Sequence, residues 1–150
     1  MNRIRKGFTL VEILIVVIIL GILAAIVIPQ FTQASEDARA SALKSDLQTM
    51  RSQLELYKVQ HLENYPNDFA AVGVDPVKFV AQLEGKTAQD GTAGGNLGPY
   101  LQKFPTNPFV TNGNTLKIGA GDCPGDGTSG WWFDTNTGKI SPNDAANKAL

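Results

Sequence analysis

The longest apolar run of the chain lies near its N-terminus, from Phe8 to Ile28, and only Thr9 and Glu12 interrupt it. Its 21 residues are close to the roughly 20 that span the hydrocarbon core of a bilayer as a helix. Basic residues and no acidic ones precede the run. Because basic flanks stay on the cytoplasmic side, we predict a cytoplasmic N-terminus, with the rest of the chain on the opposite side.

An ordinary secretory signal peptide is the alternative interpretation of this segment, because Leu23-Ala24-Ala25 resembles a weak cleavage site. Three features argue against it. A signal peptide gains nothing from an acid near the start of its apolar run, where Glu12 lies, and the run continues beyond Ala25 to Ile28. The pattern then continues as a helix, whereas a cleaved peptide would be followed by the start of a compact domain.

Beyond Pro29 the pattern becomes that of an amphipathic helix, which we predict over residues 29–64. Its apolar positions recur at spacings of three and four, typical of one helix face packed on a core. They are Leu43, Leu47, Met50, Leu54, Tyr57 and His61. We expect the lone His61 on this face to be packed, not catalytic. If both helical segments are continuous, they extend for roughly 80 Å, with a kink or local melting at Pro29.

Residues 65–150 have the pattern of a small globular head. The predicted segments are a short helix over 76–83, strands over 115–119 and 130–134, a flexible surface loop over 87–98 and a loosely held tail over 141–150. Turn residues at 134–138 lead to Lys139-Ile140, which predicts a hairpin of the last two strands. The fold class is therefore α+β, with the long helix packed on a small antiparallel sheet.

Composition excludes several classes of function. The net charge is −1 and no basic patch follows the N-terminus, so we expect no direct nucleic-acid partner. The chain has one His and one Cys and no nucleophile or phosphate-binding motif, so we do not expect an enzyme. Cys123 cannot form an intrachain disulfide and is either a small packed residue or an intermolecular crosslink.

Glu12 is the residue that most needs a partner, because an acid inside a membrane segment is costly. No Lys, Arg or His occurs between Lys6 and Arg39. A cation appears only if the chain is cut after Gly7, which leaves a free amine on Phe8. Glu12 would then meet its own amine or that of a neighbouring subunit, and in the second case the pairing favours lateral assembly.

The stretch from Lys6 to Glu12, Lys-Gly-Phe-Thr-Leu-Val-Glu, resembles the processing motif of type IV pilins and type II secretion pseudopilins. The resemblance implies cleavage after Gly7 by a prepilin peptidase, N-methylation of Phe8, and a filament with the N-terminal helices at its centre. It also implies that Gly21 and Pro29 weaken the helix between them during assembly.

The resemblance completes the predicted domain plan. Residues 1–7 are the prepilin leader, 8–28 the transmembrane helix, 29–64 the amphipathic helix and 65–150 the head. In the head, Asn64-Tyr65-Pro66, Gly98-Pro99-Tyr100-Leu101 and Gly130-Trp131 resemble the major, G-type pseudopilin of type II secretion. The paired cysteines that close the terminal loop of many type IV pilins are missing.

The implied function is that of a structural subunit of a type II secretion pseudopilus, which polymerises through its N-terminal helix to drive protein export. The alternatives are a type IV pilin or competence pseudopilin, serving adhesion, motility or DNA uptake, and a membrane-tethered binding module. The implied partners are further copies of the chain, the prepilin peptidase, the inner-membrane assembly platform and minor pseudopilins. The implied location is the inner membrane, crossed once, with the head in the periplasm.

A calcium ion is the one cofactor that the resemblance suggests, in the loop over 119–129 before the last hairpin. Asp122 and Asp126 supply candidate carboxylate ligands, and Ser129 with backbone carbonyls would complete six or seven oxygens. The alternative is a Gly-rich turn with solvated carboxylates. Otherwise no cofactor is expected.

Overall fold

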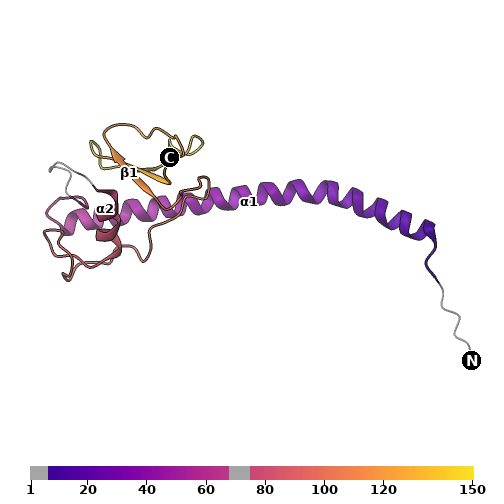
Figure 1. Cartoon of the computed structure of the whole chain (residues 1–150), viewed down its shortest axis with the longest axis horizontal. Coiled ribbons are helices and arrows are strands. Elements are labelled where there is room, and N and C mark those ends of the chain that lie inside the picture. Colours follow the sequence, from indigo (N-terminus) through magenta and orange to yellow (C-terminus); the bar gives the residue numbers. More distant parts are fainter. Residues whose placement is uncertain (1–6, 68–74) are drawn as a thin grey trace, which may run out of the picture. The chain divides into compact units, whose positions relative to one another are not determined.

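The computed structural model describes residues 7–67 and 75–150, which contain two helices and one three-stranded sheet (Figure 1). The chain divides into two compact units, Met1–Ala40 and Ser41–Leu150. Helix α1 (Leu10–Gln60) provides the helical part of the first unit and continues into the second. The expected α+β class is confirmed.

Helix α1 is uninterrupted at Pro29, so of the kink or local melting expected there, local melting is not found in the subunit. Proline removes one backbone donor and crowds the preceding turn, but the remaining bonds of a 51-residue helix hold it together. The helix ends at Gln60, a little before the predicted boundary. Leu62 and Glu63 then adopt positive φ angles of 55° and 65°, a left-handed conformation that cannot continue the helix.

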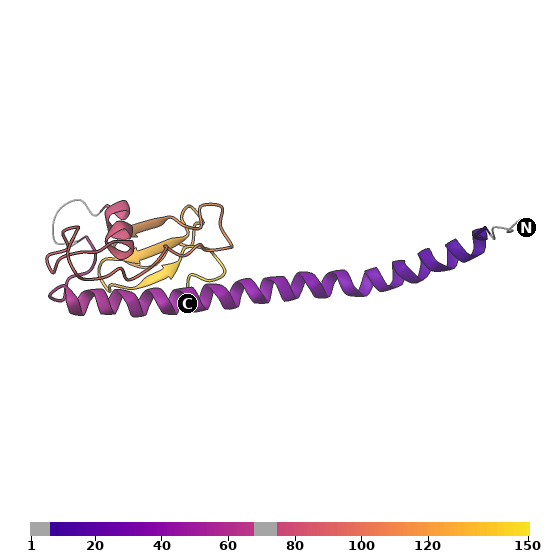
Figure 2. The same cartoon turned by 90° about the horizontal axis from the view of Figure 1, so that it is seen from below.

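Within the second unit, the predicted apolar face of α1 forms one side of the core. Leu43, Leu47, Met50, Leu54 and Tyr57 are all buried. The other side includes Phe79 and Leu83 from α2 (Pro76–Glu84) together with Leu116, Trp131, Phe133 and Ile140 from the sheet. Both views show the sheet and α2 beside the C-terminal part of α1 (Figures 1 and 2).

His61 lies at the end of this face and is packed, as the sequence predicts. Its ring stacks on that of Tyr57, with centroids 3.7 Å apart. Nδ1 is 2.8 Å from the Tyr57 carbonyl and Nε2 is 2.9 Å from Oγ1 of Thr87. Both ring nitrogens therefore have partners, and His61 joins the end of α1 to the loop that follows α2.

Helix α2 begins where its sequence predicts. Asp75 accepts a hydrogen bond from the Val77 amide at 2.9 Å, which caps the helix, and Pro76 occupies the first helical position. A proline is tolerated there because the first turn needs no amide donor. The cap directs the apolar face of α2, with Phe79 and Leu83, into the core.

The sheet is mixed, so the prediction of an antiparallel sheet is only partly correct. Strand β2 (Trp131–Asp134) lies between β1 (Leu116–Gly119) and β3 (Ile140–Pro142). β2 and β3 are antiparallel, which confirms the hairpin, whereas β1 and β2 are parallel. A parallel pair needs a connection that crosses back along the sheet, and the loop between β1 and β2 makes this return.

Two segments that the sequence describes as loose are held by specific contacts. In the 87–98 segment, Thr87 is buried and pairs with both Ala93 and Leu97. In the 141–150 tail, Asn143 and Asp144 are buried, and the Leu150 carbonyl accepts a hydrogen bond from Arg51 at 2.9 Å. Small polar residues in a sequence usually indicate solvent exposure, but Thr87, Asn143 and Asp144 are buried and hydrogen bond to backbone groups.

We predict that Leu47→Ala lowers the free energy of unfolding of the head by roughly 2–5 kcal/mol, because it leaves a cavity against the core. Leu56→Ala is the matched control, since Leu56 lies on the same helix but is 44% exposed, and its effect should stay within about 0.5 kcal/mol. Denaturant unfolding of the detergent-solubilised chain, followed by near-UV circular dichroism of the two tryptophans, measures both. Equal effects would show that the predicted face does not form the core.

Candidate functional site

The apolar segment of α1 has no cover within the described chain. Every large apolar side chain from Phe8 to Ile28 is at least 41% exposed. By its length and composition, α1 is able to cross a membrane, and its most apolar stretch lies near the N-terminus. A soluble subunit would bury such a surface, so the exposed segment needs lipid or other chains around it.

Glu12 is bound by Thr9 at the start of this segment. Oε2 of Glu12 accepts hydrogen bonds from the Thr9 amide at 2.8 Å and from the Thr9 hydroxyl at 2.7 Å. The Glu12 amide donates to Oγ1 of Thr9 at 3.3 Å. This reciprocal arrangement is a capping box, and it satisfies amides that the first helical turn leaves without partners.

Sequence reasoning missed this role of Thr9. The signal was present, because a Thr followed three residues later by a Glu before an apolar run is the capping-box pattern. Glu12 therefore has a partner in the uncleaved chain, although that partner is neutral. The carboxylate remains without a countercharge in the described segment, where the nearest basic residue along the sequence is Arg39.

The remaining residues of the predicted assembly site lie along the same segment. Gly7 and Phe8 precede α1 and are exposed, so the junction between them is accessible. Gly21 faces open space, since a Cβ placed there would meet nothing within 4 Å. Pro29 lies inside the helix. These residues do not gather into a pocket, and their arrangement along one exposed helix is typical of an interaction surface.

In the head, the loop over 119–129 is organised by the side chain of Asn143. Oδ1 of Asn143 accepts hydrogen bonds from the amides of Gly125 at 2.9 Å and Asp126 at 3.2 Å. Nδ2 donates to Oδ1 of Asp126 at 2.7 Å and to the Ser129 hydroxyl at 2.9 Å. Asn143 is completely buried, and the sequence alone did not indicate its role.

Asp126 is held by neighbours that stabilise its charge. Oδ1 accepts further hydrogen bonds from the hydroxyl and amide of Thr128, at 2.7 and 3.0 Å. Oδ2 is 3.7 Å from Nζ of Lys117. The Thr128 bonds, with smaller contributions from Asn143 and Lys117, lower the pKa of Asp126 to about 2.

Two of the three side chains proposed as calcium ligands, Asp126 and Ser129, are already hydrogen bonded within the head. Calcium takes six to eight oxygens, among them carboxylates free to bind it, whereas Oδ1 of Asp126 already accepts three hydrogen bonds. The Ser129 hydroxyl donates to the Trp131 carbonyl at 2.9 Å and accepts from Asn143. No group of three or more His, Cys, Asp or Glu suited to a metal occurs in the described ranges 7–67 and 75–150.

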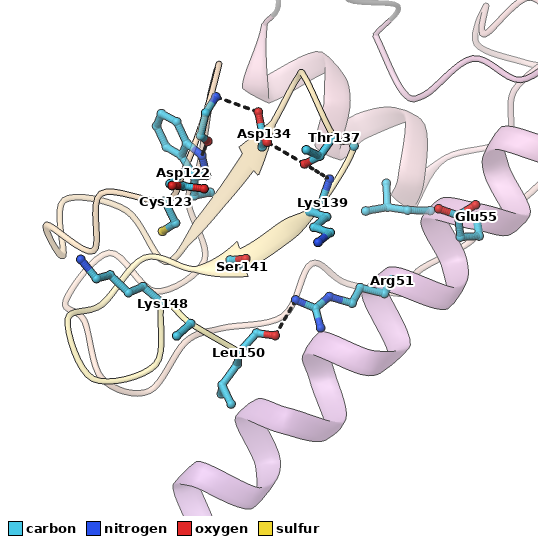
Figure 3. Close-up of a pocket in the computed structure, with 15 residues that line it drawn as sticks. Arg51, Glu55, Asp122, Cys123, Asp134, Thr137, Lys139, Ser141, Lys148 and Leu150 are labelled. Atoms are coloured by element: carbon cyan, nitrogen blue, oxygen red, sulfur yellow. Dashed lines mark hydrogen bonds between the residues drawn. The ribbon is translucent and has the colours of Figure 1, made fainter.

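Asp122 lies apart from this network, in a pocket of about 810 Å³ between α1, the last hairpin and the chain terminus (Figure 3). Its charged lining residues have both signs: Arg51, Lys139 and Lys148 against Glu55, Asp122 and Asp134. Arg51 is already bound to the carbonyls of Ile140 and Leu150. The pocket lining therefore does not favour a ligand of either charge, and Arg51 stabilises the head through its own hydrogen bonds.

Asp134, on the wall of this pocket, fixes the hairpin. Burial raises the pKa of Asp134, but hydrogen bonds from Thr137 and from the amides of Asn136 and Gly121 outweigh it and lower the pKa overall. The Thr137 hydroxyl donates to Oδ2 at 2.6 Å (Figure 3). Gly138 completes the turn with a φ of 70°, which L side chains rarely adopt.

Cys123 occupies the edge of the same loop and is partly buried. Its thiol lies 3.3 Å from the Pro142 carbonyl and 3.5 Å from Oδ1 of Asn143. Burial raises the pKa of the Cys123 thiol, and a raised pKa makes a thiol less reactive. These contacts favour the packed interpretation of Cys123 over that of an exposed crosslinking residue.

Comparison with known proteins extends the match beyond the N-terminal motif. The family model for the prokaryotic N-terminal methylation motif matches residues 2–28. Type II secretion system core protein G of Pseudomonas aeruginosa is 34% identical over 108 residues, which cover 72% of this chain and 70% of that protein. The protein of the same name from Dickeya chrysanthemi is 33% identical over 110 residues, covering 73% and 66%.

A shorter similarity connects the chain to pilins. The type IV major fimbrial protein FimA of Dichelobacter nodosus is 46% identical over 55 residues, which cover 37% of this chain and 35% of that protein. No solved structure matches the chain significantly. The matches to core protein G extend over about twice as many residues and reach well into the head. The chain belongs to the family of the type II secretion system core protein G.

Proposed function

We propose that this chain is the structural subunit of a type II secretion pseudopilus, which polymerises through its N-terminal helix to drive protein export. The observation that carries the proposal is the contrast along α1. The apolar side chains of its first part are exposed, whereas the apolar face that follows Ser41 is buried in the head. The exposed part is covered by lipid before assembly and by the helices of other subunits in the filament.

Processing begins at the exposed junction of Gly7 and Phe8. A prepilin peptidase removes residues 1–7, and the new amine of Phe8 is methylated, in keeping with the matched N-terminal methylation motif. Both residues precede the helix, so cleavage requires no unwinding of α1.

After cleavage, Glu12 gains a charged partner. The Phe8 amine is four residues from Glu12, and the neighbouring subunit offers an equivalent amine. Pairing across subunits favours lateral docking, because a carboxylate at membrane depth is energetically costly until it is paired with an opposite charge. Thr9 holds Glu12 at the helix start before this exchange. Gly21 and Pro29 allow the helix between them to loosen as subunits pack.

The proposed location follows from the same helix. The chain crosses the inner membrane once, with its N-terminus in the cytoplasm and its head in the periplasm, since the basic residues precede the apolar run. The partners are other copies of the chain, the peptidase, the inner-membrane assembly platform and minor pseudopilins. The role is structural and requires neither an enzymatic activity nor direct contact with nucleic acid.

A type IV pilin is the second candidate, and the similarity to FimA is the observation that favours it. Pilins and pseudopilins use the same assembly chemistry at the N-terminal helix, so the heads and the genetic context must separate them. A competence pseudopilin shares this helix as well. A membrane-tethered binding module would keep residues 1–7, and Glu12 would then retain its bonds to Thr9 but gain no charged partner from the Phe8 amine.

Cleavage is tested by mass spectrometry of protein extracted from the membrane. The expected mass is that of a chain starting at Phe8 and carrying one methyl group. Gly7→Ala is a mild control and Gly7→Trp a severe one, since a bulky residue should block the junction and leave the leader attached. A chain starting at Met1, or one starting at Ile26 after signal-peptide cleavage, would contradict the proposed processing.

Assembly through Glu12 is tested with Glu12→Ala and Glu12→Gln. Both should insert in the membrane normally and lose most filaments, because an amine left unpaired at a buried interface costs roughly 3–5 kcal/mol. Glu12→Gln retains an oxygen for the Thr9 cap, so it separates loss of charge from loss of the cap. Shearable filaments and crosslinking between subunits are the measurements, with the exposed Glu36→Ala as control. Wild-type assembly of Glu12→Gln would rule out the charge pairing.

The choice between secretion and a surface pilus is tested by deleting the gene. We expect exported hydrolases to disappear from the medium while surface fibres remain, because the proposed filament acts in the periplasm. Complementation with the wild-type chain controls for effects on neighbouring genes. Normal secretion with lost fibres would overturn the secretion role and favour the pilin.

A further inference from the structure

The loop over 119–129 lies where the family resemblance suggests calcium, yet two of its three candidate side-chain ligands are already bound to protein partners. Asp126 and Ser129 are both hydrogen bonded to Asn143, and Asp122 lines a separate pocket. The loop is closed by contacts that do not depend on filament assembly, because all the residues concerned lie within the head.

The Asn143 carboxamide makes the contacts that gather the loop. It reaches three loop residues in addition to the nearby Cys123 thiol: Gly125 and Asp126 through Oδ1, and Asp126 and Ser129 through Nδ2. Its backbone adds two more bonds, from its amide to the Gly130 carbonyl at 3.0 Å and from the Gly127 amide to its own carbonyl at 2.9 Å. A single buried residue thus holds the loop from 125 to 130.

An amide can take the place of a cation here because the loop presents donors as well as acceptors. A cation gathers only oxygens, but the amides of Gly125 and Asp126 point at Oδ1 of Asn143. The charge of Asp126 still needs a positive neighbour. Lys117 on β1 supplies it, with Nζ 3.7 Å from Oδ2, and also bonds to the Thr128 hydroxyl.

The position of Asn143 is itself fixed on both sides. It directly follows β3, which pairs with β2, and it precedes Asp144, which is also buried. Oδ2 of Asp144 accepts a hydrogen bond at 2.9 Å from Asn107, another fully buried amide. Because these neighbours are held in place, the Asn143 carboxamide is presented to the loop in one orientation.

We propose that Asn143 closes the 119–129 loop in place of calcium, so that the head of this chain folds and keeps its loop without the ion. The proposal gives Asn143 a positioning role and assigns the balancing charge to Lys117.

The first test compares the full-length wild-type chain in detergent with excess EGTA and with millimolar CaCl₂. Hydrogen–deuterium exchange of peptides covering 119–130 and the thermal unfolding midpoint should be the same in both conditions, and titration calorimetry with CaCl₂ alone should show no binding to the head. Slower exchange of this loop in calcium, a higher midpoint in calcium, or saturable calcium binding that Asp126→Asn abolishes would overturn the proposal.

The second test removes the carboxamide. In EGTA, Asn143→Ala should speed exchange of the Gly125 and Asp126 amides by roughly tenfold or more, since both lose their acceptor. Asn143→Asp should do the same to the loop, because an oxygen replaces the Nδ2 donor that faces Oδ1 of Asp126. Asn114→Ala, at an exposed Asn of the head, is the matched control and should leave exchange unchanged.

Wild-type protection of the loop in Asn143→Ala would overturn the proposal. If that variant does not fold, the calcium comparison on the wild-type chain decides the matter alone, because it needs no substitution.

Discussion

The structure depends on helix α1, whose N-terminal part exposes apolar side chains and whose C-terminal part buries them in the head. The apolar surface of α1 before Ile28 is exposed and has no partner in the described chain, whereas the stripe from Leu43 to Tyr57 is buried by the head. The first part needs lipid or other helices, and the second needs the sheet and α2. Since both belong to the same element, the subunit carries its anchor and its core on one continuous backbone.

The start of this helix shows how one side chain serves two successive states. In the intact chain, Glu12 caps the helix through Thr9, which satisfies first-turn amides and gives the carboxylate neutral partners. Removal of residues 1–7 would create a cation four residues away. The cap therefore holds the carboxylate at the position where the proposed pairing needs it, and the same residue can act before and after processing.

The head is small and has only short strands, so polar side chains contribute much of its order. Asn107 and Asn143 are fully buried, and each of their carboxamides bonds to several partners. Asp134 fixes the last turn in a similar way. Such networks are favourable only when every member is satisfied, and no buried side-chain nitrogen or oxygen of the described residues lacks a partner.

Features that depend on neighbouring residues along the chain could be predicted from the sequence. Helical periodicity identified the buried face of α1, the pattern over 76–83 predicted α2, and the turn at 134–138 predicted the last hairpin. The Glu12 cap was equally local and was missed only because the acid was considered without Thr9. The tertiary structure decided what depends on distant residues. Three features leave no periodic signal in the sequence: the parallel pairing of β1 with β2, the burial of the polar tail, and the contacts of Asn143 with a loop 14 to 18 residues away. The physical reason is that hydrogen bonds between remote segments are set by packing and not by spacing along the sequence.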